Sequence, residues 1–159
     1  MEKTESGGSV IEGKNSFCGP AALAVLLKTD TDIAAKAIRI VSKQYAVKGA
    51  YPSHLLKVIH KYRGICIKNR GVQGMPQWKA AKGSPLTLIT VQLNCGVWHF
   101  MLMHRGKLFD NHTKKWMKAT EHPNRNGKII EAYVIHTKPR LLKHDVEKII
   151  HTWVPRQYY

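Results

Sequence analysis

The stretch NSFCGPAALAVLL, residues 15–27, places a cysteine in front of Gly-Pro and an unbroken apolar segment behind it. The run 21–27 has the composition of a buried helix. Pro20 suits the first turn of a helix, because its missing N–H would have no partner there in any case. The sequence therefore predicts a helix from about Cys18 to Lys28, with the thiol at the start of the helix rather than inside it.

A thiol in this position has a chemical use. The nucleophilic form of cysteine is the thiolate, and the N–H groups and dipole of a helix start stabilise an anion. The same N–H groups can hold the oxyanion that forms when a thiolate attacks a carbonyl. We interpret Cys18 as a candidate nucleophile. Cys66 and Cys95 lie in strand-like segments and are interpreted as small core residues.

Two further helices are expected directly after the first. The segment TDTDIAAKAIRIVSKQY has apolar residues at helical spacing, and Asp30 or Asp32 can cap its start. The segment YPSHLLKVIHKYRG follows, with Ser53 expected as its cap and Gly64 as its end.

Strand-like segments dominate the rest of the chain, so the order of elements predicts an α+β fold with N-terminal helices packed on a mostly antiparallel sheet. Residues 1–13 are expected to be a flexible lead-in, and residues 14–159 a single domain. The expected strands are 65–69, 85–93, 97–104, 107–111 and 128–138, with a short helical segment at 75–83 and a closing helix at 141–153.

A base and an orienting group for the thiol lie in one predicted hairpin, VWHFMLMHRGKLFDN, residues 97–111. With a two-residue Arg-Gly turn, strand alternation places His99 and Asp110 on one face as diagonal neighbours. A three-residue turn would put Asn111 in that place. We prefer Asp110, because a carboxylate also stabilises the imidazolium that forms when the base takes a proton.

Two other histidines are weaker candidates for the base. His104 is an odd number of residues from His99 and is expected on the opposite face of the sheet. His112 lies near the end of the next strand and is a potential neighbour of the site.

The Cys-Gly-Pro-Ala helix start, a strand-borne His99 followed by apolar residues, and Asp110 on the next strand resemble the papain-like superfamily of cysteine peptidases. Within it, the chain is most similar to the bacteriocin-leader (double-glycine) peptidases and their peptidase-like relatives. The resemblance covers residues 15–30 and 85–136. It implies a papain-like fold in which Cys18 is the nucleophile, His99 the base and Asp110 the orienting residue.

One position departs from that family. Its members usually carry a glutamine several residues before the cysteine, where the amide helps hold the oxyanion. The corresponding residue here is Glu12, which cannot donate a hydrogen bond when ionised, and Asn15 is the nearest amide that would replace it. Losing one oxyanion donor typically costs on the order of a hundredfold in rate. The departure therefore leaves room for a weak enzyme or an inactive relative.

Charge is the other strong signal. Lys and Arg outnumber Asp and Glu by 26 to 10, a formal net charge of +16. Between Ile33 and Phe109 there are 13 Lys and Arg and no acidic residue. Such a region should attract nucleic acid or an acidic protein. Its expected contact residues are Lys36, Arg39, Lys43, Lys57, Lys61, Arg63, Lys68 and Arg70, with Tyr45, Tyr51 or Trp78 for base stacking.

Other patterns narrow the class of protein. The three cysteines form no CxxC pair, which argues against a disulfide framework and a four-cysteine zinc site. The polar N-terminus lacks a secretion signal, and the longest apolar run is too short to cross a bilayer. We expect a cytoplasmic protein without membrane insertion, cofactor or metal.

Two functional hypotheses follow. The first is a cysteine hydrolase, a peptidase or a related amidase or isopeptidase, that acts on a peptide or protein through Cys18, His99 and Asp110. The second is a catalytically weak or inactive protein of the same fold that binds nucleic acid or an acidic protein through its basic surface. It lacks any base-reading motif, and its compact basic character suits a phage or bacterial gene product.

Overall fold

The structure is a computed structural model that describes residues 13–15, 17–43 and 51–137. The chain divides into two compact units, and each is described by itself. Among the described residues, the helical unit holds those from 13 to 65 together with 136 and 137, and the sheet unit comprises Cys66–Ile135. The expected lead-in lies outside the described residues except for Gly13, and the expected closing helix at 141–153 lies outside them entirely.

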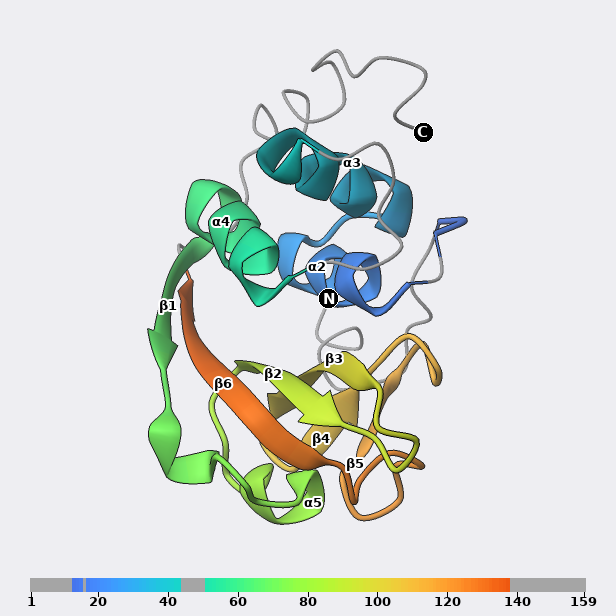
Figure 1. The fold of residues 1–159 in the computed structure, drawn as a ribbon, viewed down its shortest axis with the longest axis vertical. Coiled ribbons are helices and arrows are strands. Elements are labelled where there is room, and N and C mark those ends of the chain that lie inside the picture. Colours follow the sequence, from blue (N-terminus) through green and yellow to red (C-terminus); the bar gives the residue numbers. More distant parts are fainter. Residues whose placement is uncertain (1–12, 16, 44–50, 138–159) are drawn as a thin grey trace. The chain divides into compact units, whose positions relative to one another are not determined.

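In the helical unit the first two helices form as predicted (Figure 1). Helix α2 spans Cys18–Leu27 and ends at Lys28, which has a left-handed backbone with φ of 54°. Helix α3 spans Thr31–Ser42. Of the two expected caps, Asp30 has the role, because its side chain accepts a hydrogen bond from the backbone N–H of Ile33 at 2.8 Å.

The start of helix α4, Pro52–Tyr62, differs from the prediction. Ser53 is not the cap but the second residue of the helix, because Pro52 takes the first position, for which its fixed φ is suited. The residue before the helix is Tyr51, whose N–H donates to Nδ1 of His54 at 3.4 Å. Gly64 likewise does not end this helix but begins the next strand.

A six-stranded sheet provides the second half of the α+β fold (Figure 1). Every pairing with a recorded register is antiparallel, and the strand order is β1-β6-β2-β3-β4-β5. The short helices η1, Arg70–Val72, and α5, Gln77–Ala80, lie between β1 and β2 in the chain. The strands are β1 Gly64–Lys68, β2 Thr87–Gln92, β3 Trp98–His104, β4 Lys107–Phe109, β5 Trp116–Lys118 and β6 Lys128–Thr137.

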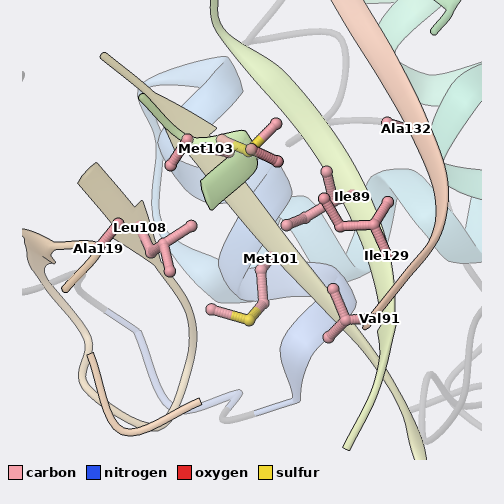
Figure 2. Close-up of a cluster of buried hydrophobic side chains, with 10 residues drawn as sticks. Ile89, Val91, Met101, Met103, Leu108, Ala119, Ile129 and Ala132 are labelled. Carbon is pink, nitrogen blue, oxygen red and sulfur yellow. The ribbon is translucent and has the colours of Figure 1, made fainter. Parts of the chain in front are cut away.

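One face of this sheet carries a buried apolar cluster, shown in Figure 2. On the central strands β2 and β3, Ile89 lies opposite Met101, and Val91 lies opposite His99. His99 therefore continues the row of side chains that Met101 and Met103 place in the core. The remaining members of the cluster are Ala80, Ala81, Leu108, Ala119, Ile129 and Ala132.

A break in the sheet register lies beside this row. Strand β2 shifts its pairing with β6 between Thr90 and Val91, which is a β-bulge or a similar irregularity. Such irregularities bend a strand locally and are common next to functional sites. This one lies at the residue that faces His99. Among the described residues, no helix is long and apolar enough to cross a membrane.

Candidate functional site

A tight turn sets the register of the hairpin that carries the predicted base. His104 pairs with Lys107, so Arg105 and Gly106 are the only loop residues between β3 and β4. The even loop length places His99 and Asp110 on one face. Nε2 of His99 lies 3.0 Å from Oδ2 of Asp110, and both side chains are buried. The expected contact is therefore confirmed for Asp110, and Asn111 does not take its place.

The Asp110 carboxylate accepts hydrogen bonds at both oxygens. Oδ1 accepts from the backbone N–H of Thr113 and from its hydroxyl, each at 3.0 Å. Oδ2 accepts from the amide of Asn124 at 2.7 Å in addition to His99. Burial alone would raise the pKa of Asp110, but hydrogen bonds from His122, His99 and Thr113 outweigh it and hold that pKa well below its usual range. Asp110 is therefore an anion at neutral pH.

His122 is a buried residue of this cluster that the sequence did not indicate. Its Nε2 lies 3.3 Å from Oδ1 of Asp110, and its Nδ1 accepts the backbone N–H of Asn124 at 3.0 Å. Because Nδ1 must present a lone pair to that N–H, the ring carries its proton on Nε2 and donates to Asp110. His122 thus contacts Oδ1 of the carboxylate, whereas His99 contacts Oδ2.

Asn124 and His112 complete the cluster. The amide nitrogen of Asn124 contacts Oδ2 of Asp110 and Nδ1 of His112, at 2.7 and 3.0 Å. Only a donor is favourable beside a carboxylate, which fixes the orientation of this amide. The His112 ring stacks on the His99 ring, with centroids 4.5 Å apart and planes 18° apart. His112 is 52% exposed, so it is the outermost histidine of the group.

The arrangement decides which nitrogen of His99 is the base. The ionised Asp110 accepts the proton on Nε2, so the neutral ring has its lone pair at Nδ1. Nδ1 is therefore the atom that can take a proton, and Asp110 stabilises the imidazolium that results. This pair is capable of general base catalysis. The ligand atoms of His99, Asp110 and His112 also lie within 4.8 Å of one another, close enough for a metal ion.

The predicted nucleophile lies in the helical unit. Cys18 is the first residue of α2 and is partly buried. The first helical bond runs from Ala21 N–H to Phe17 C=O at 3.1 Å, so the N–H groups before Ala21 lie at the open start of the helix. No acidic residue lies in the first turn. The backbone around this thiol therefore favours its anion.

The segment in front of the thiol is anchored by an acidic residue on the next helix. Both carboxylate oxygens of Asp32 accept hydrogen bonds, from the N–H of Lys14 at 2.9 Å and of Asn15 at 3.0 Å. Gly13 has a φ of +111°, and a Cβ there would collide with Thr31. The side-chain oxygen of Asn15 accepts the N–H of Phe17 at 3.0 Å. Because this bond uses the amide oxygen, the NH₂ group of Asn15 retains its ability to donate.

Cys18 belongs to the helical unit and His99 to the sheet unit. Their convergence, and with it the Cys18–His99–Asp110 triad, stays a prediction. So does the role of Asn15 at the oxyanion, while Glu12 lies outside the described residues.

The other two cysteines and His104 differ in their surroundings. Cys66 lies on β1, and burial raises the pKa of its thiol to about 11, in keeping with its interpretation as a structural residue. The same interpretation is wrong for Cys95, which is exposed in the turn after β2 and not part of a core. The His104 ring contacts Trp116, with centroids 6.3 Å apart.

The expected basic surface is distributed over both units. Lys43, Lys57 and Lys61 are exposed on the helical unit, but Arg63 is only 8% exposed and does not belong to an exposed surface. In the sheet unit, Lys68 pairs with Glu131 at 3.7 Å. This acidic residue lies outside the acid-free span in sequence and reaches it across the sheet. A single continuous patch stays a prediction.

Comparison with protein-family models, curated proteins and solved structures found no match to this chain.

Proposed function

We propose that the protein is a cysteine hydrolase of papain-like fold that cleaves an amide bond in a peptide or protein. The observation that carries the proposal is the buried His99–Asp110 pair, with 3.0 Å between Nε2 and Oδ2. A histidine held in this way by an ionised carboxylate can use its second nitrogen as a base. The sequence supplies the matching nucleophile at the start of α2.

In the proposed reaction, Nδ1 of His99 takes the proton of the Cys18 thiol. The thiolate attacks the carbonyl carbon, and the carbonyl electrons move to the oxygen, which accepts hydrogen bonds from the start of α2 and from Asn15. The imidazolium then protonates the leaving amine, which departs and leaves a thioester on Cys18. Water, activated by His99, hydrolyses the thioester and restores the thiol.

The Asp110 cluster acts on the base and not on the substrate. Thr113, His122 and Asn124 hold the carboxylate in place, so that it accepts from His99 without needing to reorganise when the imidazolium forms. Preorganised groups of this kind lower the barrier because the site pays no reorientation cost during the reaction. These three residues are therefore positioning residues.

The test is the rate at which Cys18 reacts with iodoacetamide as a function of pH, in a Cys66→Ser, Cys95→Ser background. An ordinary thiol loses reactivity below its pKa of about 8.5. We expect the Cys18 rate to stay high down to about pH 6, where a thiolate of low pKa reacts about tenfold faster than an ordinary thiol, after allowing for its weaker nucleophilicity.

His99→Gln is the matched variant for this measurement, and His60→Gln, on the exposed side of α4, is the control. His99→Gln should move the midpoint of the profile towards about 8.5, whereas His60→Gln should leave it unchanged. A profile that is already ordinary in the parent protein would refute the hydrolase. So would a lowered midpoint that is the same in the parent protein and in His99→Gln.

A second function is favoured by the exposed lysines of the helical unit, Lys43, Lys57 and Lys61, which belong to a span without acidic residues. We propose that this unit binds nucleic acid electrostatically. Affinity should fall with salt at a log–log slope of about −0.7 to −0.9 per phosphate contacted, and Cys18→Ala should bind as well as the parent. No binding at about 50 mM salt would leave solubility or an acidic protein as the role of these charges.

A further inference from the structure

We propose that His99, Asp110 and His112 form a binding site for one Zn²⁺ ion. The donor atoms are Nε2 of His99, Oδ2 of Asp110 and Nδ1 of His112, and all three lie within 4.8 Å of one another. The carboxylate oxygen is 3.0 Å from the first nitrogen and 3.7 Å from the second. Two imidazoles and one carboxylate are a donor set that zinc uses in sites with an open fourth position.

The spacing fits that ion. Zinc binds nitrogen and oxygen at about 2.0–2.2 Å with tetrahedral geometry, which places neighbouring ligand atoms about 3.3 Å apart. The two distances from Oδ2 lie on either side of that value. The His112 ring is now stacked on that of His99 with planes 18° apart, so it has to turn to direct Nδ1 at the ion, which its half-exposed position allows while the two buried ligands stay in place.

The shell around Asp110 already supports coordination through one oxygen. Oδ1 is held by Thr113 and by His122, which leaves Oδ2 as the oxygen that faces both His99 and His112. Outer hydrogen bonds of this kind fix the direction of a ligand and raise its affinity for metal. His122 and Thr113 thus have the same orienting role whether Asp110 faces a proton or a zinc ion.

Binding requires two changes, both of which the site permits. The proton on Nε2 of His99 leaves for water as the nitrogen–zinc bond forms, Nδ1 takes up a proton from water so that the ring stays a neutral imidazole, and no group is oxidised or reduced. The Asn124 amide now directs its hydrogens at Oδ2 and at Nδ1 of His112. A half-turn of this amide exchanges its two ends, so that the amide oxygen of Asn124 and not its hydrogens faces the ion.

The consequence for catalysis rests on the proposed function. A zinc ion on Nε2 takes the place of the proton that His99 shares with Asp110, and its positive charge opposes a second charge on the same ring. With zinc on Nε2, the neutral ring carries its proton on Nδ1, so this nitrogen has no lone pair with which to accept the proton of a thiol. Zinc is therefore expected to inhibit the hydrolase, whereas zinc binding itself needs neither Cys18 nor catalysis.

The test is a competition between the Cys18→Ser protein and a chromophoric zinc chelator, followed by titration with Co²⁺ as a spectroscopic substitute. We expect one equivalent of zinc, no competition by Mg²⁺, which prefers oxygen ligands, and a cobalt spectrum without a thiolate band.

His112→Ala should weaken zinc binding at least tenfold. His112→Phe keeps an aromatic ring on His99 but lacks the nitrogen, and should do the same. His60→Ala is the exposed control and should have no effect.

Equal affinity in the parent, His112→Ala and His112→Phe proteins would overturn the proposal, as would a thiolate band that assigns the metal to Cys66 or Cys95. The two proposals fail separately. Zinc binding in a protein whose Cys18 labels like an ordinary thiol keeps the zinc site and removes the hydrolase. An activated Cys18 in a protein that does not bind zinc keeps the hydrolase and removes the zinc site.

Discussion

Cys18 and Cys66 are both partly buried thiols, yet their surroundings differ in the feature that governs thiol chemistry. Cys18 lies at the start of a helix, where backbone N–H groups and the helix dipole favour the anion. Cys66 lies on strand β1, where burial raises its pKa to about 11. The comparison predicts that two partly buried thiols can differ in their readiness to ionise, because one lies at a helix start and the other on a strand.

The largest expected effect is the difference in reactivity between these two thiols. At pH 7 in the folded protein, with EDTA present, Cys18 should react with iodoacetamide about a hundredfold faster than Cys66, because only a minute fraction of Cys66 is ionised. Peptide mass spectrometry after timed quenching measures both rates in one sample. Rates within about threefold of each other would break the comparison.

The second effect concerns the carboxylate that the base requires. The pKa of Asp110 is lowered on folding, so Asp110 contributes stability above its unfolded pKa of about 3.9, and this contribution is lost as pH falls below that value. We expect a loss of about 1.4 kcal/mol per pH unit from this residue. Urea unfolding between pH 5 and 2.5, in EDTA, should give a steeper fall for the parent than for Asp110→Asn. Parallel curves would show that Asp110 is not held as an anion.

The smallest expected effect concerns the reactivity of Cys18 and not that of Cys66. Asp32→Ala removes the two hydrogen bonds that anchor Lys14 and Asn15 in front of α2, and should cost about 1 kcal/mol. It should also slow Cys18 labelling a few-fold and leave Cys66 unchanged. Ser53→Ala is the control, since Ser53 is exposed and does not cap α4. A loss in Ser53→Ala as large as in Asp32→Ala would contradict this assignment.

Much of this architecture could be predicted because it depends on local rules. The apolar run behind Cys18 and the cap at Asp30 determined α2 and α3, and strand alternation placed His99 beside Asp110 once the turn had an even length. Ser53 was wrongly expected as a cap because the preference of Pro52 for the first helical position was not weighed. Each success came from a local pattern: an apolar run, a capping residue or the alternation of a strand.

The contacts that could not be predicted lie in turns and short strands, where the sequence has no repeating pattern. His122 and Asn124 approach Asp110 through turns between β5 and β6, and turns carry no repeating pattern from which such a contact can be read. Strand β5 has only three residues, too few for an alternation to show. Glu131 reaches Lys68 across the sheet from a distant part of the chain. The sequence does carry a signal for His112, which lies directly after the predicted strand 107–111.

The most direct test of the central claim is the distance between the Cys18 sulfur and the ring of His99 in a crystal structure of the protein without metal. The account predicts that Sγ lies within about 4 Å of Nδ1, allowing for the looser geometry of an unliganded site, while Nε2 keeps its bond to Asp110. A His99 ring that points away from the start of α2, or a sulfur that faces Nε2, would contradict it.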